Sequence, residues 1–284
     1  MTPLAAEQIR RNLLRDGEWE VAAGHRREVT RRLVAPGAPR KRLCVLGAGN
    51  ANDLELPELA AAYQEVCLVD LDGDALARGV SRQFSAPQAG VLKQRIVLRG
   101  GIDLTGIGEH LAARAAAADW RLPSHDDPLA SAVDPGTHGL AGPFDVVASV
   151  GLLSQLIESV TSTAPEEAAW RWPLLLAVRT GHLRLCARLM EPGGWGLLVT
   201  DFVSSVTCPG LADVAGDDLP GLASRWAAAG NFFHGLNPLF LPDLFASDAV
   251  LRELTYDARP AGYWLWRQRA RCYAVLGLSF RRVV

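Results

Sequence analysis

The chain has 284 residues and a mass of 30.5 kDa, and with 49% hydrophobic and 21% charged residues it is neither disordered nor fibrous. This length suits one α/β domain with additions better than two equal domains. The net charge of −2 argues against a general nucleic-acid binder. No charged start followed by an apolar stretch opens the sequence, and its apolar runs are far shorter than the ~20 residues of a membrane helix. We therefore expect a cytoplasmic protein without a membrane partner.

The five cysteines are odd in number, widely spaced and mostly inside apolar runs. This usage favours buried thiols over a disulfide framework or a zinc site. Lysine occurs twice, whereas arginine and alanine are abundant, which is typical of a GC-rich bacterial genome.

The first 40 residues are predicted to form a helical appendage. Residues 5–14 and 25–34 carry apolar side chains at helical spacing, and the PGAP stretch at 36–39 ends the second helix. Arginines outnumber acids there, which fits either a solvated helix face or an anionic partner. Residues 41–284 are then expected to form one domain.

A β-α-β unit opens that domain. An apolar run over residues 43–46 ends at Gly47-Ala48-Gly49, where two glycines allow a tight turn close to a ligand. Asn50, Asn52 and Asp53 can accept hydrogen bonds from free N–H groups at the start of a helix, which is expected to begin between Asn52 and Pro57 with Pro57 in its first turn. A second strand over residues 66–69 ends on Asp70, about 20 residues past the glycine turn. A carboxylate at that place is suited to accept hydrogen bonds from ribose hydroxyls.

Two families of nucleotide-binding proteins use such a glycine loop, and the spacing of the glycines helps to choose between them. The dinucleotide pattern G-x-G-x-x-G would place its third glycine at position 52, which is Asn52 here. The loop instead resembles motif I of the class I S-adenosylmethionine-dependent methyltransferases, D/E-x-G-x-G-x-G, with Gly47 and Gly49 as its first two glycines. Val45 stands where that family usually has an acid, and Ala51 replaces the last glycine.

The next segments extend this resemblance. Asp72 is expected to cap a helix that runs to about residue 84. Residues 95–99 (RIVLR) are predicted to form a third strand. Asp103 follows that strand, where the family often has an aspartate that accepts a hydrogen bond from the adenine amino group. The alternative is that Asp103 only caps a helix over residues 105–118.

Residues 122–143 are rich in Pro, Gly, Asp and Ser, and they are expected to form an irregular surface loop. His125 and His138 lie in it without partners at metal-ligand spacing. Residues 144–150 (FDVVASV) resemble the family's fourth strand, which would bring Ser149, Gly151 and Gln155 to the cofactor or the acceptor. An N/D-P-P-Y/F motif does not follow, which argues against methylation of a nucleobase or of glutamine.

A helix is expected over residues 166–190, with His182 on its surface. Residues 192–200 (PGGWGLLVT) resemble the family's entry into its fifth strand, where glycines allow a sharp turn. A helix near residues 241–254 and β segments at 263–266 and 272–280 complete the pattern, and they correspond to the antiparallel hairpin that ends methyltransferase sheets.

The resemblance covers residues 42–282 in order, and it implies a doubly wound, mostly parallel, seven-stranded Rossmann-like α/β sheet with an antiparallel C-terminal hairpin. It also implies S-adenosylmethionine as the cofactor and methyl transfer to an acceptor, for which we favour a small molecule. The cofactor-binding residues that it implies are Gly47, Ala48, Gly49, Asn50, Asp70, Leu71, Asp103, Leu104, Ser149 and Gly151. The family's N-terminal additions cover the cofactor or shape the acceptor site; packing on a sheet edge is the alternative.

The acceptor side is predicted from residues 201–240, which leave the carboxyl end of the sheet and are rich in aromatic side chains. His234 is the candidate base there, with an ordinary pKa near 6.5; alternatively it is exposed on a loop that Phe232 and Phe233 anchor. Two other functions stay open. One is binding of the cofactor without catalysis, and the other is a nicotinamide-dependent oxidoreductase, against which the missing third glycine and the PGG turn argue.

Overall fold

The computed structural model describes residues 3–34, 41–85, 90–117 and 128–284, and it is built on a seven-stranded sheet. The strand order is β3-β2-β1-β4-β5-β7-β6, in which β1 to β5 are parallel and β7 is antiparallel to both of its neighbours. The predicted mostly parallel sheet with an antiparallel C-terminal hairpin is confirmed. The strands are β1 (Arg42–Leu46), β2 (Glu65–Val69), β3 (Ile96–Arg99), β4 (Phe144–Val150), β5 (Met190–Ser204), β6 (Thr255–Arg267) and β7 (Cys272–Arg282).

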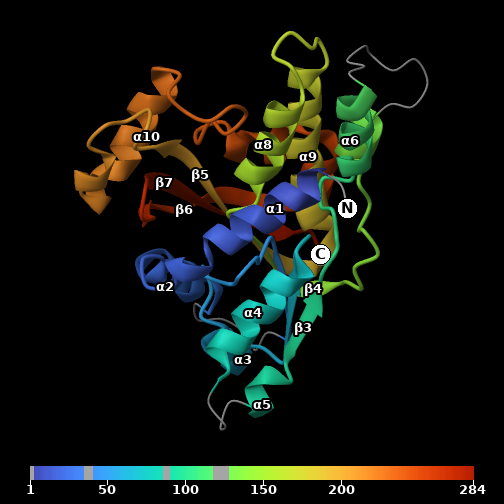
Figure 1. Ribbon diagram of the computed structural model, residues 1–284, viewed down its shortest axis with the longest axis vertical. Helices are drawn as coiled ribbons and strands as arrows, with labels where there is room; N and C mark the ends of the chain where they lie inside the picture. Colours follow the sequence, from blue (N-terminus) through green and yellow to red (C-terminus); the bar gives the residue numbers. More distant parts are fainter. Residues whose placement is uncertain (1–2, 35–40, 86–89, 118–127) are drawn as a thin grey trace.

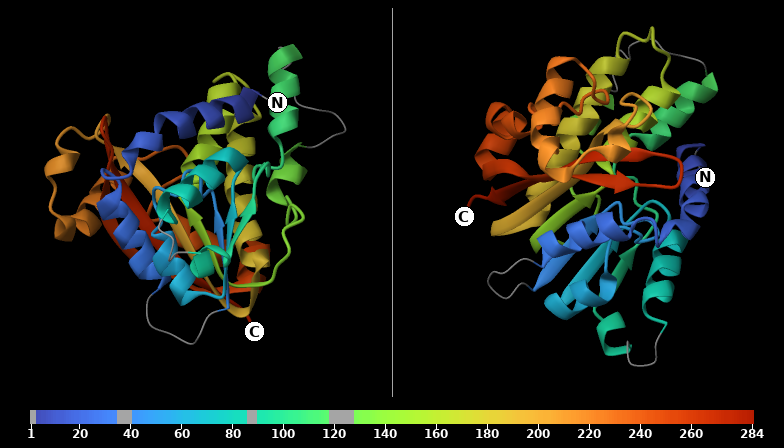
Figure 2. Two further views of the ribbon diagram at one scale, coloured as in Figure 1. Left: turned by 60° about the horizontal axis from the view of Figure 1, so that its bottom comes forward. Right: turned by 90° about the vertical axis from the view of Figure 1, so that its left-hand side faces the viewer.

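Helices cover both faces of this sheet (Figures 1 and 2). One face packs against helices from residues 23–83 and the other against helices from residues 108–254, so that two apolar layers form. The first layer contains α2 (Ala23–Leu33), α3 (Leu56–Ala62) and α4 (Gly73–Gln83). The second contains α6 (Gly108–Ala117), α8 (Leu153–Thr163), α9 (Arg171–Leu189), α10 (Leu219–Ala228), α11 (Leu241–Ser247) and α12 (Ala249–Leu254).

The alternation of side chains along β1 explains why its sequence is apolar throughout. Leu43 and Val45 enter the layer of α2 to α4, whereas Cys44 and Leu46 enter the layer of α6 to α12. All four side chains are buried because a strand between two helical layers has no solvent face. The continuous apolar runs in the sequence therefore follow from the doubly wound arrangement.

The structure differs from the sequence-based expectation in several places. The expected loop at 122–143 contains a helix, α7 (Pro128–Val133), while His125 lies outside the described residues. The helix expected over 241–254 is divided by Asp248, whose side chain caps α12. The helix expected to begin near residue 166 begins at Arg171. The prediction that His182 lies on the surface of that helix is wrong, because α9 packs this face onto the sheet and leaves His182 only 1% exposed.

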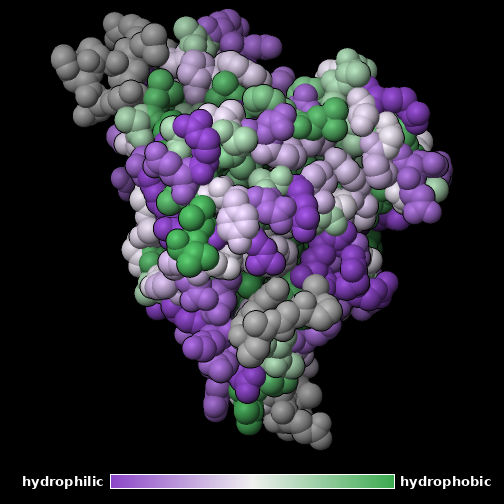
Figure 3. Space-filling view, turned by 180° about the vertical axis from the view of Figure 1, so that it is seen from behind, coloured by the Kyte–Doolittle hydropathy of each residue, from purple (hydrophilic) through white to green (hydrophobic). Residues whose placement is uncertain are grey.

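The surface of the molecule carries no extended apolar face in the view of Figure 3, where hydrophobic residues lie scattered among hydrophilic ones. Among the described residues, no helix combines the length and the apolar character needed to cross a bilayer. The appendage consists of α1 (Pro3–Leu14), a short 3-10 helix η1 (Asp16–Glu18) and α2, and α1 lies beside α4 and α6 (Figure 1).

The strand order fixes where a ligand can enter. The chain builds outward from β1 to β2 and β3, and then returns to place β4 on the other side of β1. At such a switch point the loops at the carboxyl ends of the two central strands diverge and leave a crevice. The loops that begin at Gly47 and at Gly151 border it.

The closeness of α4 to the glycine loop provides a test of this packing. A Cβ added at Gly79 in α4 would lie 2.3 Å from the carbonyl oxygen of Asn50, so Gly79→Ala must displace backbone. We expect a loss of about 1–3 kcal/mol in the free energy of unfolding, measured in urea. Gly221→Ala in α10 is the control, since nothing lies within 4 Å of its added Cβ. That variant should be stabilised by up to about 1 kcal/mol; equal effects of the two changes would contradict the packing.

Candidate functional site

The loop after β1 is held by the carboxylate of Asp70 at the end of β2. Gly47 and Gly49 have φ values of 76° and 47°, which glycine adopts without strain. In this conformation the Gly49 N–H donates to Oδ2 of Asp70 at 2.8 Å, and the Asp72 N–H donates to Oδ1 at 2.9 Å. Burial raises the pKa of Asp70, and the two backbone donors oppose that rise.

Ala51 stands where the resembled motif has its last glycine, and it adopts the backbone conformation of a glycine. Its φ is 51°, in the left-handed region, and its side chain is fully buried. Holding an alanine there costs about 1–2 kcal/mol. The departure from the motif thus leaves the path of the loop unchanged.

Two asparagines of the loop bind the end of α1. Asn50 donates from Nδ2 to the carbonyl of Asn12 at 2.5 Å, and Asn52 donates to the carbonyl of Arg15 at 2.7 Å. The last carbonyls of a helix have no partner within it, and Asn50 satisfies that of Asn12. The carbonyl of Arg15, just after the helix, accepts the Glu18 N–H at 3.1 Å as well as the hydrogen bond from Asn52. The position at which a dinucleotide motif would have a glycine is used here to attach the N-terminal segment.

Three neighbouring cavities lie at the carboxyl edge of the sheet. One, of about 30 Å³, adjoins the glycine loop; another, of about 40 Å³, adjoins Asp70 and Asp103; the third, of about 720 Å³, lies beyond them. We call them the loop cavity, the Asp103 cavity and the large cavity. Gln8 of α1 and Gln155 of α8 line all three, so the cavities share one wall.

The structure brings nine of the ten predicted cofactor residues to these cavities. Ala48, Gly49 and Asn50 line the loop cavity, Leu71, Asp103 and Leu104 line the Asp103 cavity, Gly47 and Asp70 line both, and Gly151 lines the large cavity. Ser149 lines none of the three. Its side chain alternates to the α9 side of β4, where its hydroxyl lies 2.8 Å from Nε2 of His182.

The two small cavities are well below the 300 Å³ or more of a typical ligand site. Side chains of α1 and of the β4–α8 turn occupy the space over the loop. A Cβ added at Gly49 would lie 3.2 Å from Oδ1 of Asn12, and one at Gly47 would lie 2.6 Å from Cβ of Leu152. A nucleotide therefore needs these side chains to move outward before it can reach the loop.

Asp103 caps the turn before α6 and also borders a cavity. Its Oδ1 accepts from the N–H and the hydroxyl of Thr105, at 2.9 and 2.6 Å, and its Oδ2 accepts from the Gly108 N–H at 2.8 Å. The capping role is thus present. Because each carboxylate oxygen has two lone pairs, Oδ2 keeps one for a ligand donor, and the adenine role stays a prediction.

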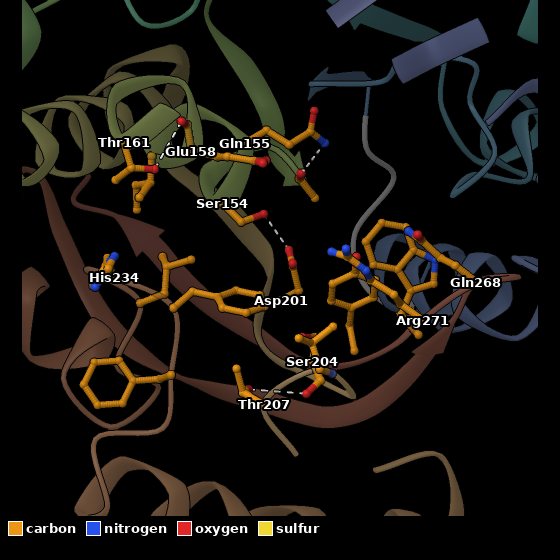
Figure 4. Close-up of a pocket in the computed structure, with 18 of the residues that line it drawn as sticks. Ser154, Gln155, Glu158, Thr161, Asp201, Ser204, Thr207, His234, Gln268 and Arg271 are labelled. Carbon is orange, nitrogen blue, oxygen red and sulfur yellow. Dashed lines mark hydrogen bonds between the residues drawn. The ribbon is translucent and has the colours of Figure 1, made fainter. Parts of the chain in front are cut away.

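A buried carboxylate lines the large cavity. Asp201, at a bulge in β5, is 8% exposed and accepts a hydrogen bond from Oγ of Ser154 at 2.5 Å. Burial raises its pKa, and the hydrogen bond from Ser154 opposes the rise. Figure 4 shows Ser154 and Asp201 pointing toward one another in the middle of the cavity. Trp266 and Tyr273 form part of the wall, with ring centres 5.5 Å apart.

His234 lines the same cavity but lies at its rim. Its side chain is exposed and meets the ring of Trp172 edge-on at 6.1 Å. In Figure 4 it stands apart from Asp201, on the side opposite Arg271. Asp201 is nearer to the wall shared with the small cavities, because Ser154 precedes Gln155 on α8. The catalytic role of His234 stays a prediction.

Sequence reasoning missed the part that α1 plays in this site. Gln8, Asn12 and Arg15 belong to no motif, and only the helical periodicity of residues 5–14 gave a signal for the helix itself. Within the described ranges, no group of three or more His, Cys, Asp or Glu side chains is arranged to hold a metal ion.

Comparison with known proteins finds no matching family model and no matching curated protein. Solved structures do match. They include the YcgJ protein from Bacillus subtilis, at 12% identity over 92% of this chain and 99% of that chain with a TM-score of 0.44. The S-adenosylmethionine-dependent methyltransferase SibL matches at 15% identity over 91% of this chain and 56% of that chain, with a TM-score of 0.41.

A third match is CalS10, an amino pentose methyltransferase from Micromonospora echinaspora whose structure contains S-adenosylmethionine. It shares 16% identity over 68% of this chain and 54% of that chain, with a TM-score of 0.31. All three TM-scores lie below 0.5.

His182 provides a test of the buried layer beneath the site. Burial lowers its pKa to about 3, whereas an unfolded histidine titrates near 6.5. Unfolding therefore takes up a proton between these values, and stability is lost as pH falls from 6.5 toward 3. We expect His182→Gln to reduce the slope of unfolding free energy against pH by about 1.4 kcal/mol per pH unit between pH 6 and 5. Urea titrations with the same slope for both proteins would contradict burial of a neutral histidine.

Proposed function

We propose that this protein is an S-adenosylmethionine-dependent methyltransferase that acts on a small-molecule acceptor bound in the large cavity. The observation that carries the proposal is the wall that the three cavities share at the switch point. Gln8 and Gln155 form this wall, with the glycine loop and Asp70 at the small cavities and the buried carboxylate of Asp201 at the large cavity. Donor and acceptor would meet across that wall. Positioning of this kind supplies much of the rate of a bimolecular transfer.

The residues of the small cavities fit the cofactor. Gly47 to Asn50 would lie against its amino-acid end, Asp70 against the ribose, and Asp103 with Leu104 against adenine. Asp70 retains lone pairs for ribose hydroxyls although each of its oxygens already accepts one backbone N–H. The bound cofactor supplies the transferable methyl group. In this proposal the appendage over residues 1–40 completes the site, since α1 contributes Gln8 and Asn12.

The large cavity suits a small acceptor. Its volume of about 720 Å³ lies within the range of small-molecule sites, and four aromatic side chains, Phe232, Phe233, Trp266 and Tyr273, form part of its wall. Asp201 would accept the proton that the acceptor loses, because a carboxylate whose pKa is raised by burial is a better base near neutral pH. His234 is retained as a second candidate, at the rim.

The large cavity also favours the hypothesis of an enzyme over that of a protein that binds the cofactor without catalysis. A buried carboxylate hydrogen-bonded to a single side chain is costly to keep, and such perturbed groups gather at functional sites. An oxidoreductase is disfavoured, because Asn52 takes the place of the glycine that lets a helix approach a pyrophosphate and uses its side chain to hold Arg15.

Cofactor choice is tested by ligand-induced stabilisation. S-adenosylhomocysteine at 100 times its Kd should raise the free energy of unfolding by ~2.7 kcal/mol, and NADH at equal concentration should not. Asp70→Asn should weaken S-adenosylhomocysteine roughly 10- to 150-fold, since charge-assisted hydrogen bonds are lost. Calorimetry on folded protein measures this; stabilisation by NADH alone would make the protein an oxidoreductase instead.

The base is tested with any acceptor found by screening small molecules against a donor with a labelled methyl group. We expect Asp201→Asn to lower turnover by about 10²–10⁴ while the affinity for S-adenosylhomocysteine is kept. His234→Ala is the comparison, because it lines the same cavity at the rim. Loss of turnover in His234→Ala with full activity in Asp201→Asn would make His234 the base in place of Asp201.

A further inference from the structure

Four buried polar atoms without hydrogen-bond partners lie together beside the glycine loop. They are Nε of Arg15, Nε2 of His25, Oδ1 of Asp53 and Nε1 of Trp266. We call these four residues the unpaired cluster. Buried polar groups are nearly always paired in folded proteins, so several unpaired ones at one place indicate a missing partner.

The four side chains contact one another through ring stacking, a cation–π contact and ion pairs that are longer than hydrogen bonds. The ring of Trp266 stacks on that of His25 with centres 4.6 Å apart, and Cζ of Arg15 lies 4.7 Å from the centre of the Trp266 ring. Nη2 of Arg15 is 3.9 Å from Oδ2 of Asp53, and Nε2 of His25 is 3.8 Å from Oδ1 of Asp53. Arg15 also forms an ion pair with Glu18, from Nε to Oε2 at 3.5 Å, which is too long for a hydrogen bond.

The hydrogen bond at Nδ1 of His25 determines which ring nitrogen carries the proton. Nδ1 accepts a hydrogen bond from Nε1 of Trp264 at 2.9 Å, and burial lowers the pKa of the ring to about 4. The ring is therefore neutral near pH 7, with its proton on Nε2. The cluster thus presents three donor groups, from Arg15, His25 and Trp266, and one acceptor, from Asp53.

The cluster lies at the amino-acid end of the proposed cofactor site. Arg15 and Asp53 line the loop cavity together with Gly47 to Asn50, and Arg15 also lines the large cavity with Trp266. A cation and an anion on one cavity wall match a ligand that carries both charges. An α-amino acid end, with its carboxylate and ammonium groups, has that chemistry.

We infer that Arg15 and Asp53 form a clamp for the amino-acid end of the methyl donor, in which the Arg15 guanidinium binds its carboxylate and the Asp53 carboxylate binds its ammonium group. Trp266 and His25 are positioning residues that hold the guanidinium and the carboxylate at the edge of the loop cavity. The inference rests on the proposed function, and it assigns binding roles to residues outside the glycine motif. The donor's arrival supplies the partners that Nε of Arg15 and Oδ1 of Asp53 lack.

The clamp is tested with two ligands that differ only at the amino-acid end. S-adenosylhomocysteine carries it, and 5′-methylthioadenosine has the same nucleoside thioether without it. In calorimetry at pH 7.5, Arg15→Gln and Asp53→Asn should each weaken S-adenosylhomocysteine by roughly 10- to 100-fold and change the affinity for 5′-methylthioadenosine by less than about 2-fold. Retained binding of the shorter ligand shows that the variants are folded.

Arg11→Gln is the matched control, since Arg11 also lies on α1 but lines only the large cavity, where it pairs with Glu158 at 2.6 Å. Its affinity for S-adenosylhomocysteine should equal that of the unaltered protein. Equal losses for both ligands in Arg15→Gln, or the same loss in Arg11→Gln, would overturn the clamp alone. If the unaltered protein binds neither ligand, the proposed function falls with it. Where the shorter ligand binds too weakly to titrate, the comparison of Arg15→Gln with Arg11→Gln decides.

Discussion

The carboxylate of Asp70 is the contact on which the arrangement of the site depends. By accepting the Gly49 and Asp72 N–H groups it joins the turn after β1 to the turn after β2. Asp72 in turn caps α4 through the Ala75 N–H and accepts from Nδ2 of Asn12 in α1. One buried anion thus aligns two strand ends, a helix start and the N-terminal segment, and its desolvation is offset by backbone donors.

The glycine loop keeps its shape although its sequence departs from the pattern that it resembles. Ala51 adopts left-handed backbone, and the fit of Gly79 against Asn50 leaves the loop no other path. Asn52 replaces a close helix approach with a hydrogen bond to Arg15. Asn50 and Asn52 attach the N-terminal segment to the loop through the carbonyls of Asn12 and Arg15.

The sequence predicted the parts of the fold that local residue patterns indicate, and it missed those that depend on contacts between residues far apart in the chain. Apolar runs and turn residues located the strands, and residues 144–150 matched β4 to the residue. Burial of His182 depended on which face of α9 meets the sheet, and the inward turn of Ser149 depended on the same packing. The motif residues lie at the cavities. Gln8 and Arg15 could not be predicted as site residues, because no pattern within residues 3–18 indicates that they contact the glycine loop.

The same contacts that complete the site also close it. Over the loop, α1 is held by the hydrogen bond from Asn50 and by the one that Asn12 donates to the carboxylate of Asp72, and Asn52 holds the carbonyl of Arg15 just after the helix. A neutral hydrogen bond contributes about 0.5–1.5 kcal/mol net, and one to a charged group about 1.5–3 kcal/mol. In the proposed function, the donor displaces the side chains of Asn12 and Gln8, and the hydrogen bonds that Asn50 and Asn52 donate to main-chain carbonyls do not involve these side chains. Since Gln8 also lines the large cavity, its displacement would reshape the wall of the proposed acceptor site, and this geometry favours binding of the donor before the acceptor.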